Sequence, residues 1–97
     1  MNKQYYVYIL TKARNSTFYV GITSELQKRI WEHKNEVADG FTKKHGIKTL
    51  VYYEVFDNPE QAIKREKRLK KWNRAWKMRV IEEMNPDWND LYEKICK

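Results

Sequence analysis

The sequence predicts a small α/β domain with an antiparallel sheet, from three strand-like runs and the helical spacing of apolar residues after them. Two of the runs lie near the N-terminus and are separated by a polar segment, as in a β-hairpin. The third lies near the middle of the chain. Because 97 residues with 41% hydrophobic content can build only one modest core, we expect a single domain over residues 1–97.

The predicted hairpin joins aromatic and β-branched residues at 5–10 (YYVYIL) and 18–22 (FYVGI) through a polar, turn-like segment at 12–17. Ser24 is then a suitable N-cap. Apolar residues follow it at roughly helical spacing, so we expect a helix over about residues 25–36.

The middle of the chain predicts a loop, a strand and the start of a second helix. Gly40 and Gly46 bracket a polar segment that we expect to be a loop. Residues 49–56 (TLVYYEVF) are the third strand candidate. Asn58 and Pro59 end that strand and open a helix, because proline suits a first helical turn.

The second half of the chain predicts helices. One apolar stripe, expected to face the sheet, allows either a single helix or two helices joined near Asn73. A stop and restart at 85–87 (NPD) precedes a short closing helix that docks on the core. The stripe consists of Ala62, Leu69, Trp72, Trp76 and Val80, and the closing segment contributes Trp88, Leu91, Tyr92 and Ile95.

Positive charge is concentrated in one segment of the chain. The net charge is +7, and residues 64–79 hold nine Lys or Arg and one acid, Glu66. Such a segment would attract a polyanion such as a phosphate backbone. A solvated helix face kept soluble by lysines explains the same charges equally well.

The single cysteine, Cys96, rules out an internal disulfide and gives no sign of secretion. The N-terminus lacks an apolar signal region, and no apolar stretch approaches the roughly 20 residues that span a bilayer. We therefore expect a cytoplasmic protein that is not attached to a membrane.

Few common catalytic templates fit the sequence. One Cys and two His cannot build a closed zinc site, and no glycine-rich phosphate loop stands out. Arg29 and His33 are four residues apart on the predicted helix, so they share a face and could converge on one phosphate. An exposed pair without function is the more common explanation of that spacing.

Glu66 falls on the core-facing side of an otherwise basic helix. Burying an unpaired charge costs several kcal/mol, so Glu66 should either pair with a cation or hold a metal ion. Arg65, Arg29 or a lysine could supply the pair. Tyr8 and Tyr19, taken singly, are ordinary packing residues of a hairpin.

Tyr6-Val7-Tyr8, followed after ten residues by Tyr19-Val20-Gly21, resembles the paired signature of the GIY-YIG nuclease superfamily. Residues 26–33 (LQKRIWEH) resemble the family's arginine helix, and residues 62–66 (AIKRE) resemble the helix that supplies its metal-binding glutamate. The similarity covers about residues 5–75, leaving 76–97 as a helical tail. That tail, through residues 85–88 (NPDW), is similar to small stand-alone bacterial members described as endonucleases; the core is similar to the N-terminal domain of the excision-repair incision subunit.

The resemblance implies an α+β fold, with a three-stranded antiparallel sheet flanked by helices, and an endonuclease that uses one Mg²⁺ or Mn²⁺. It implies that Tyr19 activates the attacking water, as general base or through a hydrogen bond, and that Tyr8 positions that network. A phenol has a pKa near ~10, so Tyr19 would need His33, another cation or the metal to lower it. Arg29 would stabilise charge on the phosphate and Glu66 would hold the metal.

The first motif departs from the family pattern, with Tyr6 in place of glycine and Val7 in place of isoleucine. Asn73 is a candidate for an asparagine of some branches, at an unexpected spacing from Glu66. The partner implied is nucleic acid, in the first place DNA, in repair or in processing of branched or damaged structures. Phosphate contacts are expected from Lys67, Lys70, Lys71, Arg74 and Lys77.

Two alternatives from other functional classes stay open. A binding module with weak catalysis would use the same basic residues and show steep salt dependence without a metal effect. An accessory subunit would use exposed parts of Trp72, Trp76 and Trp88 as an anchor, although tryptophans at helical spacing are more often core. The sequence indicates no small-molecule cofactor beyond the metal and no particular protein partner.

Overall fold

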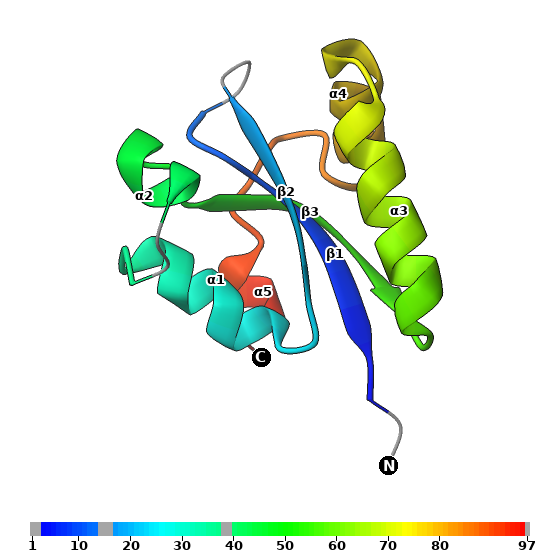
Figure 1. The fold of residues 1–97 in the computed structure, drawn as a ribbon. Helices are drawn as coiled ribbons and strands as arrows, with labels where there is room; N and C mark the ends of the chain where they lie inside the picture. The colour runs from blue at the N-terminus through cyan, green and yellow to red at the C-terminus, as the bar shows by residue number, and fades with distance from the viewer. Residues whose placement is uncertain (1–2, 14–16, 38–39, 97) are drawn as a thin grey trace.

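The structure is a computed structural model that describes residues 3–13, 17–37 and 40–96. Its centre is a three-stranded antiparallel sheet in the order β2-β1-β3. Helices α1 and α5 lie on one face, and α3 and α4 cover the other (Figure 1). The expected α+β fold with a three-stranded antiparallel sheet flanked by helices is confirmed. No helix among the described residues is both long and apolar enough to cross a membrane.

The strands follow the sequence prediction closely. They are β1 (Tyr5–Thr11), β2 (Phe18–Thr23) and β3 (Thr49–Phe56). Because side chains alternate along a strand, Val7 and Ile9 pack under α3 and α4 while Tyr8 and Leu10 pack under α1. The register between β1 and β3 shifts between Ile9 and Leu10. Part of the predicted turn, residues 14–16, lies outside the described residues.

Helix α1 (Leu26–Lys34) is two residues shorter at its C-terminal end than predicted, and its N-cap is Glu25. The prediction of Ser24 as N-cap was wrong. No side chain caps this helix, and the Thr23 hydroxyl instead accepts a hydrogen bond from the Glu25 N–H at 3.0 Å. Thr23 therefore organises the turn between β2 and α1.

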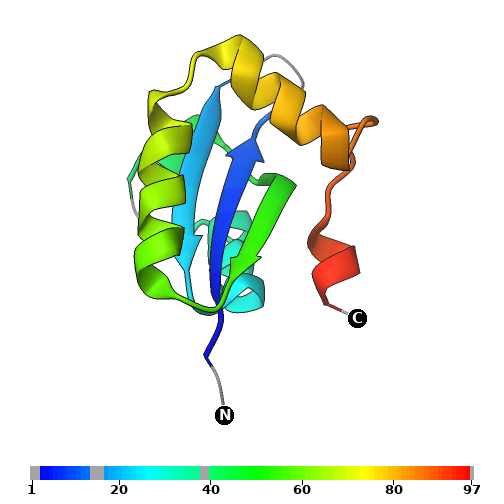
Figure 2. The ribbon, with the colours of Figure 1, turned by 90° about the vertical axis from the view of Figure 1, so that its right-hand side faces the viewer.

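The second helical layer consists of α3 (Pro59–Lys71) and α4 (Arg74–Met84). The Asn58 side chain accepts hydrogen bonds from two N–H groups of the first turn of α3. The Asn73 side chain accepts from Trp76 N and starts α4, so the two-helix alternative holds. Figure 2 shows α3 lying along the sheet and α4 crossing one end of the strands.

The segment between Gly40 and Gly46 contradicts the loop prediction, because it forms the short helix α2 (Phe41–His45). Gly46 adopts the left-handed conformation at φ 64° and closes the helix, a position that glycine occupies without strain. Five residues are too few to reveal helical periodicity in a sequence, which explains the error.

The C-terminal segment braces the α1 side of the sheet. Lys34 on α1 donates to the Asp90 carboxylate, which also accepts from Leu50 N of β3 at 3.3 Å. Leu91 N donates to Leu50 O at 2.8 Å, just before the closing helix α5 (Tyr92–Ile95). Trp88, expected in that helix, precedes it with a positive φ of 57° and packs in the core.

Candidate active site

The two motif strands place their tyrosines on one face of the sheet. In the β1–β2 register Tyr8 lies opposite Gly21 and Leu10 lies opposite Tyr19. Residues directly opposite each other share a face, so Tyr8 and Tyr19 are diagonal neighbours under α1. Their ring centroids are 6.4 Å apart. β2 is an edge strand, so this pair lies beside the open edge of the sheet.

Gly21 is explained by the ring of Tyr8. A Cβ atom placed on Gly21 would lie 2.4 Å from Tyr8 Cζ and 2.5 Å from its hydroxyl oxygen. Atoms of folded proteins do not approach that closely, so any larger residue would displace the Tyr8 ring. The glycine of the second motif therefore seats the tyrosine of the first.

His33, on α1, connects both tyrosines to α2. Its ring centroid lies 5.8 Å from that of Tyr8 and 5.6 Å from that of Tyr19. The Tyr8 hydroxyl oxygen is 3.0 Å from His33 Nε2, and Thr42 Oγ1 is 2.9 Å from His33 Nδ1. All three side chains of this hydrogen-bonded chain are at most 3% exposed, so it is fixed within the fold.

Burial sets the protonation states of this chain. It lowers the pKa of His33 to about 4, with the positive charge of Arg29 as a further cause, and His33 is therefore neutral at neutral pH. Burial likewise raises the pKa of Tyr8 to about 12, partly offset by Arg29. The expectation that His33 could act as a cation on Tyr19 is therefore not supported, because the ring is uncharged.

A neutral imidazole has one N–H and one bare nitrogen, so the chain has two possible arrangements. In the first, Tyr8 donates to Nε2 and the Nδ1–H group donates to Thr42. In the second, Thr42 donates to Nδ1 and the Nε2–H group donates to Tyr8. The ring therefore couples the two hydroxyls: where Thr42 accepts a hydrogen bond Tyr8 donates one, and where Thr42 donates Tyr8 accepts.

Arg29 lies one helical turn before His33 and near Tyr8, so the predicted common face is confirmed. Its Nη1 is 3.2 Å from Glu32 Oε1, and its side chain is 37% exposed. A guanidinium has five N–H donors, and this ion pair leaves others for a ligand. The side chain is thus held from one side and accessible from another.

Tyr8, Tyr19 and His33 together form what we call the tyrosine cluster. Glu66 belongs to α3, a helix of the opposite layer. Its side chain is only 13% exposed, and its Oε2 is 2.7 Å from Lys70 Nζ one turn later. This is one of the two alternatives left open by the sequence, an ion pair with a lysine. The Glu66 carboxylate thus pairs with Lys70, whereas Tyr8, Tyr19, Arg29 and His33 lie together on the α1 side of the sheet.

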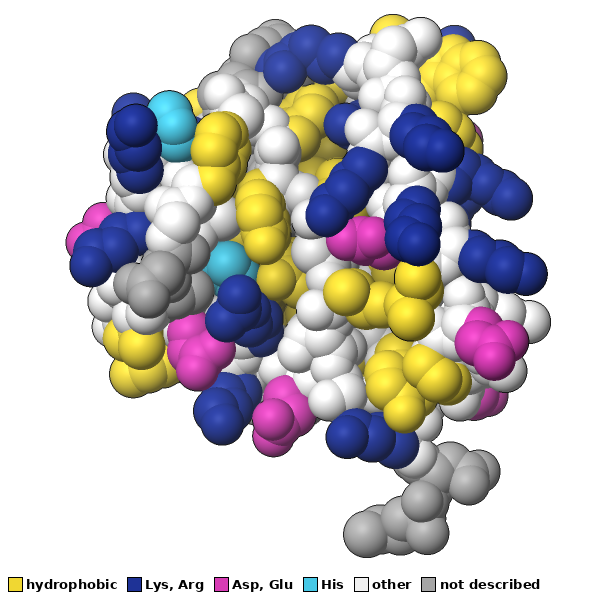
Figure 3. Space-filling model, in the orientation of Figure 1, with side chains coloured by type: hydrophobic (Ala, Val, Ile, Leu, Met, Phe, Trp, Pro, Cys, Tyr) yellow, Lys and Arg dark blue, Asp and Glu magenta, His cyan; other side chains and the backbone are white. Residues whose placement is uncertain are grey.

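The predicted nucleic-acid contacts lie on the surface of α3 and α4. Figure 3 views the molecule from the β2 side, with Lys and Arg side chains over α3 around an acidic group. A histidine side chain is visible on the same face, across hydrophobic side chains, on the α1 side. Arg74 stacks over the Phe18 ring at 4.5 Å, and Lys77 donates to Lys70 O. Lys67, Lys70, Lys71 and Arg74 are exposed, and Lys77 is half-buried.

Thr42 is the site residue that the sequence did not reveal. It lies nine residues after His33 in a segment predicted to be a loop, and no spacing rule joins the two. Asn73 caps α4 and so has a structural use. Of the three tryptophans considered as an anchor, Trp76 is 52% exposed, whereas Trp88 is buried and Trp72 is partly buried.

The donor set is compatible with a hard divalent cation at Glu66. The described residues contain no cluster of three or more His, Cys, Asp or Glu side chains. Mg²⁺ does not need one, because it keeps several waters and is commonly bound through one or two carboxylates plus substrate phosphates. A single partly buried carboxylate beside a basic surface fits that mode.

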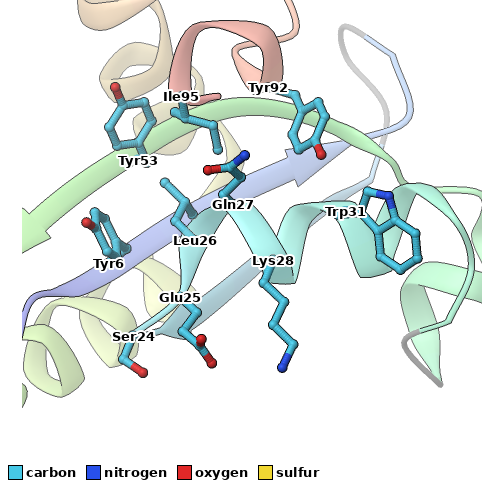
Figure 4. Close-up of a pocket in the computed structure, with 10 residues that line it drawn as sticks. All are labelled: Tyr6, Ser24, Glu25, Leu26, Gln27, Lys28, Trp31, Tyr53, Tyr92 and Ile95. Carbon is cyan, nitrogen blue, oxygen red and sulfur yellow. The ribbon is translucent and has the colours of Figure 1, made fainter. Parts of the chain in front are cut away.

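A pocket of about 700 Å³ lies elsewhere, between the start of α1, α5 and the sheet. Figure 4 shows the side chains of Tyr6, Tyr53 and Tyr92 around it. None of the five predicted catalytic residues lines this pocket. The tyrosine cluster lies apart from this pocket, beside the β2 edge of the sheet.

Three comparisons with known proteins gave matches that are consistent with one another. The model of the GIY-YIG catalytic domain family matches residues 4–79. A UPF0213 protein of Clostridium perfringens is 41% identical over 89 residues, covering 92% of this chain and 94% of that protein. A UPF0213 protein of Staphylococcus saprophyticus is 35% identical over 80 residues, covering 82% and 96%.

A solved structure resembles the same fold. The solution NMR structure of a UPF0213 protein from Bacillus halodurans superposes with a TM-score of 0.56 at 24% identity. The match covers 93% of this chain and 95% of that one. At this identity the likeness shows the fold alone.

Proposed function

The chain belongs to the GIY-YIG family, and on that premise we propose that it is a metal-dependent endonuclease that hydrolyses phosphodiester bonds in DNA. The observation that carries the proposal is the convergence of Tyr8, Tyr19 and His33, with ring centroids 5.6–6.4 Å apart, beside the Arg29 guanidinium. Phenol, imidazole and guanidinium groups supply proton handling and phosphate binding. A cytoplasmic location belongs to the proposal and suits the single cysteine.

Tyr19 is proposed to activate the attacking water, as general base or through a hydrogen bond. Tyr8 stays protonated at neutral pH because burial raises its pKa to about 12, so it positions the network rather than accepting a proton. The water oxygen forms the new bond to phosphorus, and the bond to the leaving oxygen breaks. Arg29 is proposed to donate to the non-bridging oxygens, where negative charge develops.

Glu66 is proposed to hold the divalent cation, Mg²⁺ or Mn²⁺. When bound, the ion would neutralise charge on the phosphate and the leaving oxygen. Lys70 now pairs with the Glu66 carboxylate, and a bound cation would replace its ammonium group as the partner of that carboxylate. Glu66 would thus change partners, with Lys70 becoming free to contact a phosphate.

The basic surface of α3 and α4 is proposed to bind the nucleic-acid backbone. Its residues are those predicted, namely Lys67, Lys70, Lys71, Arg74 and Lys77. Because phosphate contacts carry no sequence information, this surface would bind DNA without choosing a sequence. Repair or processing of branched or damaged DNA suits such an enzyme, since structure rather than sequence would define its substrate.

The test is cleavage of a labelled panel of duplex, branched and single-stranded DNA and RNA. Each substrate is incubated with Mg²⁺, with Mn²⁺ and with a chelator. Wild type is compared with Glu66→Ala, Glu66→Gln and Tyr19→Phe, and Glu60→Gln on the same helix is the matched control. We expect metal-dependent cutting that falls at least about 100-fold in the first three variants and is unchanged in the control.

Absence of cutting by folded wild type, with salt-dependent binding retained, would replace this proposal by the binding module. That alternative rests on a specific observation, because Lys70 already neutralises the Glu66 carboxylate of the basic helix. Cutting that persists in Glu66→Ala would leave the nuclease standing but remove Glu66 as the metal ligand.

A further inference from the structure

Helix α2 presents an unusual set of side chains beside the tyrosine cluster. Four of its five residues are exposed, namely Phe41, Lys43, Lys44 and His45. The fifth, Thr42, is buried and bonded to His33. Consecutive Cα atoms are about 3.8 Å apart, so Phe41 lies one residue from a side chain that contacts the site. Figure 3 shows basic, histidine and hydrophobic side chains gathered over α2.

Phe41 and His45 form a ring pair on the outer surface of this helix. Their centroids are 4.3 Å apart with an interplanar angle of 42°, as residues four apart on a helix allow. Phe41 is nevertheless 45% exposed, so His45 covers only part of its ring. A half-covered, supported aromatic ring has the form of a stacking platform.

The lysines on the same short helix indicate what the platform binds. Lys43 and Lys44 add positive charge beside the rings, on the opposite side of the β2 edge from the basic surface of α3. Aromatic rings alternating with cations are the usual features of sites for unpaired nucleotides, where bases stack and phosphates pair. A duplex exposes base edges but not base faces, so a ring can stack only on a base that has left the helix.

We propose that α2 is a binding element for unpaired nucleotides, in which Phe41 and His45 stack on a base and Lys43 and Lys44 contact its phosphates. The proposal deepens the proposed function, on which it rests for the neighbouring reaction site, by naming the substrate class. DNA with an unpaired strand next to a duplex arm would contact both helices. The duplex backbone would lie on the basic surface of α3, and the unpaired strand would lie on α2.

The test measures binding without cleavage, so that it does not depend on catalysis. Fluorescence anisotropy in chelator compares a labelled duplex with the same duplex carrying a single-stranded flap. Phe41→Ala should weaken flap binding roughly tenfold, since a stacked base contributes about 1–3 kcal/mol, and change duplex binding less than about twofold. Trp76→Ala, which removes an equally exposed ring from α4, is the matched control and should affect both DNAs alike.

Two more substitutions of Phe41 distinguish base stacking from simple apolar contact. Phe41→Leu keeps an apolar side chain without a π face, so flap affinity should fall, whereas Phe41→Trp should preserve it. The lysines are tested separately: replacing both Lys43 and Lys44 with Gln should reduce the salt slope on a single strand by about 1.4, at roughly 0.7 per phosphate contact.

Equal weakening of flap and duplex by Phe41→Ala, or full binding by Phe41→Leu, would overturn the proposal, provided that thermal melting shows the variant folded. If flap binding depends on Phe41 but the protein cuts no DNA, the role of α2 in binding unpaired nucleotides would be supported and the proposed nuclease activity would be refuted. If the protein cuts DNA with metal but substitution of Phe41 does not change flap binding, the nuclease activity would be supported and the proposed role of α2 would be refuted. The failures of the two proposals are therefore distinguishable.

Discussion

On the α1 side of the sheet, the polar groups of the candidate site are held by residues from three different elements. On the α3 side, Glu66 pairs with a lysine one turn along its own helix. The chain of Tyr8, His33 and Thr42 is buried and joins β1, α1 and α2. The Glu66–Lys70 pair is local, and Lys70 is 55% exposed.

The buried hydrogen bonds on the α1 side are set when the protein folds, whereas the ion pair on the α3 side could be rearranged by a bound ligand. Breaking the buried chain would leave polar atoms without partners, at about 1–3 kcal/mol for each group. The Glu66–Lys70 pair instead joins two side chains of one helix, and the side chain of Lys70 is more than half exposed to solvent. The α1 side is therefore fixed by buried contacts between elements, whereas the Glu66–Lys70 pair on the α3 side can change partners without breaking a contact between elements.

The strongest test of a preorganised α1 side is Gly21→Ala. The added methyl group overlaps the Tyr8 ring, so we expect the free energy of unfolding to fall by about 3 kcal/mol and cleavage to be lost. Chemical denaturation and the cleavage assay measure both effects. In the double variant Gly21→Ala/Tyr8→Leu, leucine lacks the ring atoms that the new methyl group would overlap. This double variant should therefore be more stable than Gly21→Ala alone, but inactive. A double variant less stable than the sum of the single changes would contradict the steric clash.

The second test uses pH and the buried imidazole. The pKa of His33 is lowered to about 4 in the folded state, against about 6.5 when unfolded, so the unfolded state binds the proton first. Stability contributed by neutral His33 should be complete above pH 6.5 and fall by about 3 kcal/mol as pH drops to 4. Urea unfolding of wild type and His33→Gln from pH 4 to 7.5 isolates this contribution, because the variant lacks it. Parallel curves would mean that His33 is not held neutral.

Thr42 offers a smaller effect on the same side. Thr42→Val keeps the shape but leaves His33 Nδ1 without its partner, so kcat should fall about tenfold with KM unchanged. Thr42→Ser restores the hydroxyl and should restore kcat. The ¹⁵N chemical shifts of the two His33 ring nitrogens report which tautomer is present. A change in packing alone would not alter the tautomer. Equal activity of the Val and Ser variants would show that the hydroxyl has no role in positioning.

The smallest expected effect concerns the α3 side. Lys70→Gln frees the Glu66 carboxylate, so Mn²⁺ binding without DNA, followed by electron paramagnetic resonance, should tighten a few-fold. Lys67→Gln, on the same helix but outside the pair, is the control and should leave metal affinity unchanged. If both lysines contact phosphate, each variant should lower the salt slope of duplex binding by about 0.9. Identical metal affinities in the two variants would argue against Glu66 as the ligand.

Local chemistry explains why much of this fold could be predicted from sequence. Asn58 with Pro59 marked the start of α3, and Asn73 marked the break before α4, because capping depends on residues within one turn. The glycine of the second motif and the tyrosine of the first could be recognised as a pair, although the contact that requires the glycine appears only once the strands are in register.

Other parts depend on tertiary contacts that no local pattern encodes. Helix α2 has too few residues to show a period, and Thr42 gains its role only because α2 folds against α1. For Glu66, the sequence indicated that the carboxylate needs a partner, but not that Lys70 would supply it. Trp76 shared the spacing of core residues yet is half exposed, because α4 crosses the end of the sheet instead of lying along it.

The brace at Asp90 also bears on how the protein is made. Asp90 fastens Lys34 on α1 to Leu50 on β3, and Leu91 adds a second bond to that strand. Every residue of the tyrosine cluster is translated well before these two. On the ribosome, the half of the chain that carries the tyrosine cluster therefore exists for a time without the contacts that secure α1. We expect the mature arrangement of the site to be completed only once Asp90 and Leu91 have been synthesised.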